Sequence, residues 1–234
     1  MAYRRVPFAL DEWFHCYSRG IEKDRLVFET PGDFRRLTQL LYLANDTQPV
    51  ERGRFEHVPH EKIFGLPRTH PLVSVGAYCL MGTHPHFLLQ EKTEGGITKF
   101  MRKIGTGYTM YFNLTRKRIG NLLIKPFRSK HVASDEYLQR VVQYIHLTPA
   151  EIYEPQWKKG VVQNITLLEQ KIRSYAYSSL PDYLGIARPE RTILNSETME
   201  AIGANLPPFP EILAEAKEYY AELAAGFGKN ATLA

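Results

Sequence analysis

The stretch that decides the fold is VSVGAYCLMGTHPHFLLQE, residues 73–91, which predicts two strands joined by a tight turn. Its second strand carries two histidines, His84 and His86. Side chains two positions apart on a strand share a face, so the imidazoles are expected side by side, about 6–7 Å apart. The opposite face, directed toward a core, would carry Pro85, Phe87 and Leu89.

The residues alone leave the role of this histidine pair open. Two imidazoles and one further oxygen or amide ligand can hold a divalent cation that keeps positions free for substrate oxygens. The same pattern also suits two polar side chains on a solvated sheet face. A zinc-binding protein with other chemistry is a third reading.

Length and composition place the chain among ordinary globular proteins. It has 234 residues, 44% hydrophobic and 24% charged, which allows one large domain or a domain of about 150–180 residues with an appendage. No apolar run is long enough for a transmembrane helix, and the N-terminus does not resemble a signal peptide. Cys16 and Cys79 lack metal-type spacing, which favours reduced thiols and therefore a cytoplasmic protein. Because no transmembrane helix is expected, we also expect no membrane partner.

The net charge of +5 is unevenly distributed. Residues 92–131 contain ten Lys or Arg and one acid, Glu94, among several aromatic residues. Cationic side chains pair with phosphates and aromatic rings stack on unpaired bases, so this basic segment suits a nucleic acid. A solvated basic helix face explains the same composition.

The order of the expected elements indicates the fold class. A strand over residues 12–20 is followed by a helix from Thr30 to about Ala44, a loop insertion at 46–66, the two strands described above, a helix over 97–113 and a strand over 122–132. This βαββαβ order predicts an α+β fold with a ferredoxin-like antiparallel sheet and helices on one face.

The remaining chain is expected to be helical. A third helix spans 137–147, short helical pieces follow, and an acidic helix over 211–227 ends the chain. We therefore divide the chain into a domain of residues 1–150 and a helical C-terminal extension of residues 151–234. The acidic helix either packs on the outside or covers the basic segment.

The third helix offers a candidate nucleophile. Tyr144 and Thr148 lie one turn apart on one of its faces. A tyrosine hydroxyl can attack phosphorus and form a covalent intermediate, and it is a good leaving group for resealing. Spacing alone does not select Tyr144 among fourteen tyrosines.

Several segments in a fixed order resemble one family. They are HCYSRG at 15–20, CLMGTHPHFLLQ at 79–90, YTMYFN at 108–113, KPFRSKHV at 125–132, DEYLQRVVQYIHLTPAEI at 135–152 and SYAYSSLPDYLG at 174–185. Together they are similar to the HUH-type single-tyrosine transposases, and among these to the REP-associated tyrosine transposases.

The resemblance implies a catalytic domain in residues 1–150 that cuts and transfers single-stranded DNA. His84 and His86 would bind Mg²⁺ or Mn²⁺, and Tyr144 would form a 5′-phosphotyrosine link. Thr148 stands where the family usually has Asn, a position that implies a third metal ligand. Pro85 replaces a bulky hydrophobic residue, so its strand should lack a partner on one side there.

The family further implies hairpin-containing DNA as the partner, a nucleoid-associated location, and a monomer or homodimer. The expected DNA contacts are Arg19, Lys99, Arg102, Lys103, Tyr108, Arg116, Lys117, Arg118, Arg128 and Lys130. The alternative is a nucleic-acid-binding regulator of the same fold that does not cleave.

Overall fold

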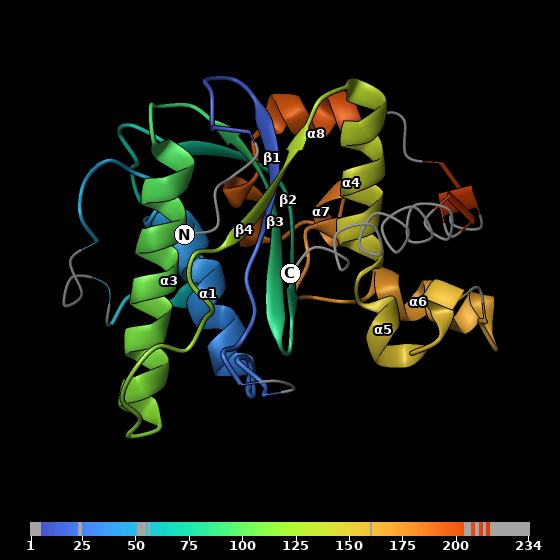
Figure 1. The fold of residues 1–234 in the computed structure, drawn as a ribbon, viewed down its shortest axis with the longest axis horizontal. Helices are drawn as coiled ribbons and strands as arrows, with labels where there is room; N and C mark the ends of the chain where they lie inside the picture. The colour runs from blue at the N-terminus through green and yellow to red at the C-terminus, as the bar shows by residue number, and fades with distance from the viewer. Residues whose placement is uncertain are drawn as a thin grey trace, which may run out of the picture.

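A four-stranded antiparallel sheet forms the centre of the protein, with strands in the order β2-β3-β1-β4. The computed structural model describes residues 6–22, 25–50, 55, 57–159, 161–203, 207–208, 211–212 and 214–215. Helices α1 and α3 cover one face of the sheet, and α4 covers the other (Figure 1). The ferredoxin-like α+β fold expected from the element order is confirmed.

The hairpin of β2 (Val73–Met81) and β3 (His84–Glu91) lies where the sequence predicts it. Its register pairs Met81 with His84 and Val73 with Glu91, with an irregularity between Val75 and Ala77. Gly76 occupies this irregularity, where an added Cβ would lie 2.9 Å from the Trp13 ring. The glycine therefore lets β1 (Trp13–Tyr17) pack closely beside the hairpin.

Helices α1 (Pro31–Leu43) and α3 (Gly96–Thr115) start where local chemistry satisfies their first backbone N–H groups. Thr30 and Asp33 form a capping box at α1. The Glu91 carboxylate accepts 2.7 Å hydrogen bonds from the backbone N–H groups of Gly95 and Ile97 at α3. The main core lies between these helices and the sheet.

Helix α4 (Asp135–Leu147) begins at the Ser134 N-cap and packs across the second sheet face. A smaller core joins Val141 and Ile145 of this helix to Ala77 and Leu88 of the hairpin. Helices therefore cover both faces of the sheet, whereas the βαββαβ order predicts helices on one face and leaves the face of the third helix open.

Two expected elements differ in extent. Strand β4 (Arg128–Val132) is shorter than predicted, because residues 122–127 join the segment after β1 through an isolated bridge and separate hydrogen bonds rather than through a continuous ladder. Within the expected loop of residues 46–66, the described part contains one short helix, α2 (His60–Ile63).

The segment after α4 packs along the outer edge of β2. It contains α5 (Ala150–Tyr153), η2 (Trp157–Lys159), α6 (Ile165–Arg173), α7 (Leu180–Tyr183), η3 (Pro189–Ile193) and α8 (Ser196–Gly203). Leu80 N–H donates to Tyr177 O at 2.9 Å, and Ser179 N–H donates to Tyr78 O at 2.9 Å. These bonds occupy backbone groups of β2 that an edge strand would otherwise expose.

The boundary at residue 150 stays a prediction. Most of the acidic helix expected over residues 211–227 lies outside the described residues. Among the described residues, no helix is both long enough and apolar enough to cross a membrane.

Candidate functional site

His84 and His86 project from β3 toward α4, as the alternation of the strand predicts. Their ring centroids lie 4.8 Å apart with the planes at 78°. Leu88, two positions further on, continues the same face into the core beneath α4, whereas Phe87 and Leu89 point into the core beneath α1 and α3. The two imidazoles therefore form one wall of a site on the α4 face.

A third histidine, His15 of β1, completes this wall. Its Nε2 lies 2.9 Å from Nδ1 of His86, and both side chains are buried. The two nitrogens share one proton. Placing that proton on His86 Nδ1 leaves the lone pair of His86 on Nε2, which is the arrangement that a metal-binding histidine needs.

Tyr144 of α4, the helix that covers this face of the sheet, reaches the histidines. Its ring centroid lies 5.5 Å from that of His15 and 5.7 Å from that of His86. The third turn of α4 carries it there, because Val141 and Ile145 anchor the helix to the sheet. The candidate nucleophile and the histidine pair thus meet within one chain.

Burial keeps all three imidazoles uncharged at neutral pH. It lowers the pKa of His15 to about 3, with a smaller effect of the Lys130 charge. Burial, followed by the neighbouring histidines, lowers the pKa of His86 well below its ordinary value. Burial also lowers the pKa of His84, against the opposing effect of Glu151. Neutral imidazoles have the free lone pairs that ligation requires.

The donor atoms present fit a divalent cation in part. Nε2 of His86 is buried without a hydrogen-bond partner. Nδ1 of His84 lies 2.8 Å from Thr83 Oγ1, which leaves its Nε2 as the second donor. No group of three or more His, Cys, Asp or Glu side chains suited to a metal occurs among the described residues. The site is therefore a two-imidazole site with open positions.

Thr148, the expected third ligand, is fully buried at the end of α4. Its hydroxyl donates a 3.0 Å hydrogen bond to the backbone carbonyl of Tyr144. In this position the hydroxyl stabilises the helix turn that carries the tyrosine.

Pro85 fits its strand without loss of a hydrogen bond. Strand β1 ends opposite His86, so Pro85 has a partner only on the β2 side. Its β2 partner, Leu80, directs its N–H to Tyr177 and its carbonyl to the Tyr175 hydroxyl, away from β3. The missing proline donor therefore faces the side beyond the end of β1.

Three of the expected DNA contacts lie on the histidine side of the sheet. Lys130 stands opposite His15 in the β1–β4 register, and Arg128 stands opposite Tyr17. Arg19 follows β1, and its charge contributes to the lowered pKa of His84. Because paired residues share a face, exposed Arg128 and Lys130 flank the site.

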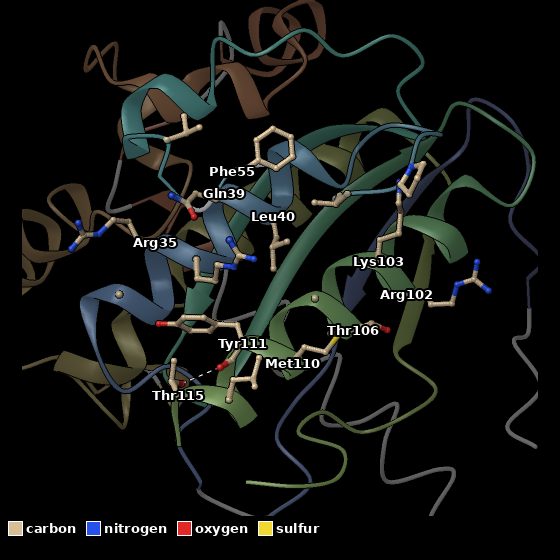
Figure 2. A pocket seen from close by; sticks show the side chains of 17 residues that line it. Arg35, Gln39, Leu40, Phe55, Arg102, Lys103, Thr106, Met110, Tyr111 and Thr115 are labelled. Carbon is tan, nitrogen blue, oxygen red and sulfur yellow. Dashed lines mark hydrogen bonds between the residues drawn. The ribbon is translucent and has the colours of Figure 1, made fainter. Parts of the chain in front are cut away.

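The cations of α3 lie on the other side of the sheet. Arg102 and Lys103 line a groove of about 960 Å³ between α1 and α3, together with Arg35, Met110 and Tyr111 (Figure 2). Lys103 donates to the backbone carbonyls of Asp46 and Gln48, so it anchors the loop that follows α1. Lys99 is exposed at the start of the same helix. The basic segment is therefore divided between two faces.

Three other expected contacts have structural roles. Tyr108 is fully buried, and its hydroxyl donates to Val27 O, so it does not reach the surface. Its place in the basic, aromatic segment and the family resemblance predicted a DNA contact, whereas the ring packs in the core. Arg116 pairs with Asp33 at 2.6 Å. Arg118 holds the turn after α3 by bonds to Asn113, Gly120 and Asn121. Lys117 is exposed there.

Sequence reasoning missed His15 as a site residue. The signal was present, because His15 and Tyr17 alternate with buried Phe14 and Cys16 on β1. What the sequence could not supply was the pairing of β1 with β3, which places His15 against His86.

Comparison with known proteins supports the fold. No family model and no curated protein sequence matches the chain. Among solved structures, the chain is similar to a REP-associated tyrosine transposase bound to a REP hairpin, with a TM-score of 0.52 and 11% identity. The match covers 81% of this chain and 90% of that chain. At this identity the likeness shows that the two chains share a fold.

Proposed function

We propose that this protein is a metal-dependent endonuclease and strand transferase for single-stranded DNA, with Tyr144 as nucleophile. The observation that carries the proposal is the position of the Tyr144 ring, 5.7 Å from the ring of His86 in the same chain. A phenol beside two neutral imidazoles with available lone pairs suits attack on a phosphodiester whose charge a cation neutralises.

In the proposed reaction, the Tyr144 oxygen forms a bond to phosphorus as the bond to the 3′ oxygen breaks. The phenolic proton is lost, the departing 3′ oxygen gains a proton, and the 5′ phosphate remains on the tyrosine. Because a phenol has a pKa of about 10, phenolate is a better leaving group than an alkoxide. Attack of a 3′-OH on the phosphotyrosine then joins strands.

His84 and His86 would hold the cation, Mg²⁺ or Mn²⁺. When bound, it would polarise the phosphodiester and stabilise charge on its oxygens. His15 would orient His86 through the Nε2–Nδ1 contact of 2.9 Å. Thr148 would support the turn that carries Tyr144.

The proposed substrate is single-stranded DNA next to a hairpin. The similar structure is a transposase bound to such a hairpin, which supports the same partner here. Arg128 and Lys130 flank the site and would contact the backbone phosphates. Since the histidines and Tyr144 meet in one chain, we propose that a monomer suffices for cleavage.

The second candidate is a non-cleaving nucleic-acid-binding regulator. Thr148 favours it, because its hydroxyl is bonded to the Tyr144 carbonyl and the described residues offer no group of three metal-type ligands. A two-ligand site binds a cation more weakly than a three-ligand site.

Covalent trapping separates the two candidates. The protein is incubated with Mn²⁺ and a panel of labelled hairpin DNAs with single-stranded flanks, then resolved on a denaturing gel. We expect a protein–DNA adduct that is absent in Tyr144→Phe and retained in Tyr137→Phe, a matched change on the same helix. An adduct that persists in Tyr144→Phe refutes the nucleophile. Binding of the panel without any adduct favours the regulator.

A further inference from the structure

A second cavity opens directly beside His84. Its volume is about 480 Å³, within the range of small-ligand sites. Residues from the first loop, α1, the hairpin turn, α5 and the segment before α7 line it: Leu26, Phe34, Met81, Gly82, Thr83, His84, Glu151, Ile152, Tyr153, Tyr175 and Tyr177.

The walls of this cavity are aromatic and pre-formed. Phe34 and Tyr177 stack face to face, with ring centroids 3.9 Å apart and planes at 12°. Tyr175 is fixed by a 2.7 Å hydrogen bond from its hydroxyl to Leu80 O. Tyr153 contributes a ring that remains 37% exposed. Such surfaces bind a flat, apolar-faced group by stacking.

The charge of the lining favours an uncharged occupant over a phosphate. Among the described residues that line the cavity there is no Lys or Arg to pair with a phosphate, and one, Glu151, is acidic. Lys158 pairs with that carboxylate. A nucleobase carries no charge at neutral pH, so the carboxylate does not repel it, and its exocyclic N–H groups can donate to carboxylate oxygens.

His84 belongs both to the cavity wall and to the histidine pair. A DNA strand whose scissile phosphate lies at the histidines would therefore have a neighbouring nucleotide at the mouth of the cavity. We propose that the cavity binds the base of an unpaired nucleotide adjoining the scissile phosphate. This inference rests on the proposed function.

The consequence is selection at the site of cutting. A paired base would have to leave its stack and its partner to enter, whereas a base in a single strand enters without that cost. The cavity thus favours single-stranded DNA and makes affinity depend on one nucleotide position.

A double-mutant cycle tests the proposal through binding alone. In a Tyr144→Phe background, affinity is measured by fluorescence anisotropy for hairpin DNA with a single-stranded flank. Each flank nucleotide in turn is replaced by an abasic nucleotide, and each DNA is bound to protein with Tyr153 or with Tyr153→Ala. We expect Tyr153→Ala to weaken binding about tenfold to a hundredfold when all bases are present. At one position next to the cut, the abasic DNA should show no further loss from Tyr153→Ala.

Two controls make the result specific. Tyr153→Phe should retain affinity because it retains the ring, and Leu167→Ala, an exposed apolar change on α6, should leave affinity unchanged. An equal loss from Tyr153→Ala on every abasic DNA would show a structural role and overturn the proposal. If the binding cycle shows coupling between Tyr153 and one nucleotide position, but the protein that retains Tyr144 forms no covalent adduct with DNA, the base site is supported and cleavage is refuted.

Discussion

His15 on β1 places its Nε2 2.9 Å from Nδ1 of His86 on β3, across two neighbouring strands. The contact occupies Nδ1 of His86, and its other nitrogen, Nε2, is buried without a hydrogen-bond partner. We propose on this geometry that His15 positions His86, at a site that the sequence describes only as a pair of histidines.

Removing the positioning histidine should weaken metal binding. We expect His15→Phe to lower Mn²⁺ affinity about tenfold to a hundredfold, because His86 then loses the partner that orients its ring and tautomer. Isothermal titration calorimetry without DNA measures the affinity. His131→Phe, a change of a half-exposed histidine paired with Glu12, serves as the control and should leave the affinity unchanged. Equal Mn²⁺ affinity for His15→Phe and the native protein would contradict the positioning role.

The role of Thr148 can be separated from metal binding. Thr148→Val keeps the shape of the side chain and removes its hydroxyl. We expect the free energy of unfolding to fall by about 1 kcal/mol, because the Tyr144 carbonyl loses a buried hydrogen bond. Mn²⁺ affinity should be unchanged, since the proposal assigns the cation to His84 and His86 and the hydroxyl to the helix turn that carries Tyr144. A drop in Mn²⁺ affinity larger than fivefold would instead identify Thr148 as a ligand. Urea unfolding and calorimetry provide the two measurements.

The two faces of the sheet should differ in their effect on the binding of single-stranded DNA. Arg128→Ala and Lys130→Ala remove cations that flank the histidines, and Arg102→Ala removes one on α3. We expect each β4 variant to weaken binding of an unstructured single strand and to reduce the slope of log K against log salt by about 0.7. Arg102→Ala should change neither quantity for this DNA. If Arg102→Ala weakened binding and the β4 variants did not, the DNA strand would lie on the α3 face of the sheet.

Acid stability should depend on the pair of Asp33 and Arg116. Burial raises the pKa of the Asp33 carboxyl, but bonds from Arg116 and from the N–H groups of Glu29 and Thr30 outweigh burial and hold its pKa below the ordinary value of 3.8. A lowered pKa in the folded state means that the stabilisation is present above the unfolded value and is lost as pH falls through the folded value.

Asp33→Asn should therefore lower the free energy of unfolding by about 1–3 kcal/mol at pH 7, and the difference from the native protein should shrink below pH 4. Urea unfolding at pH 7, 5 and 3 measures it. Glu22→Gln, which alters an exposed partner of Arg25, is the control and should change little. A difference that is the same at pH 3 and pH 7 would show that the ionised carboxylate does not contribute.

The local elements could be predicted from the sequence. Alternation over residues 73–91 indicated the hairpin and the shared face of His84 and His86, and the order and periodicity of apolar residues indicated α1 and α4. These features depend on neighbours a few residues apart, so local physics suffices to predict them. The βαββαβ order then restricted the fold to a ferredoxin-like sheet.

Which side chains meet across the sheet could not be predicted from the sequence, because it depends on strand pairing and helix packing. Strand pairing joined His15 to His86 and placed Lys130 beside His15, although 71 and 115 residues separate these pairs in the chain. The faces chosen by α3 and α4 divided one basic segment into two surfaces and buried Tyr108. The physical reason is that periodicity reports which side chains share a face of one element, whereas the packing of elements decides which faces meet.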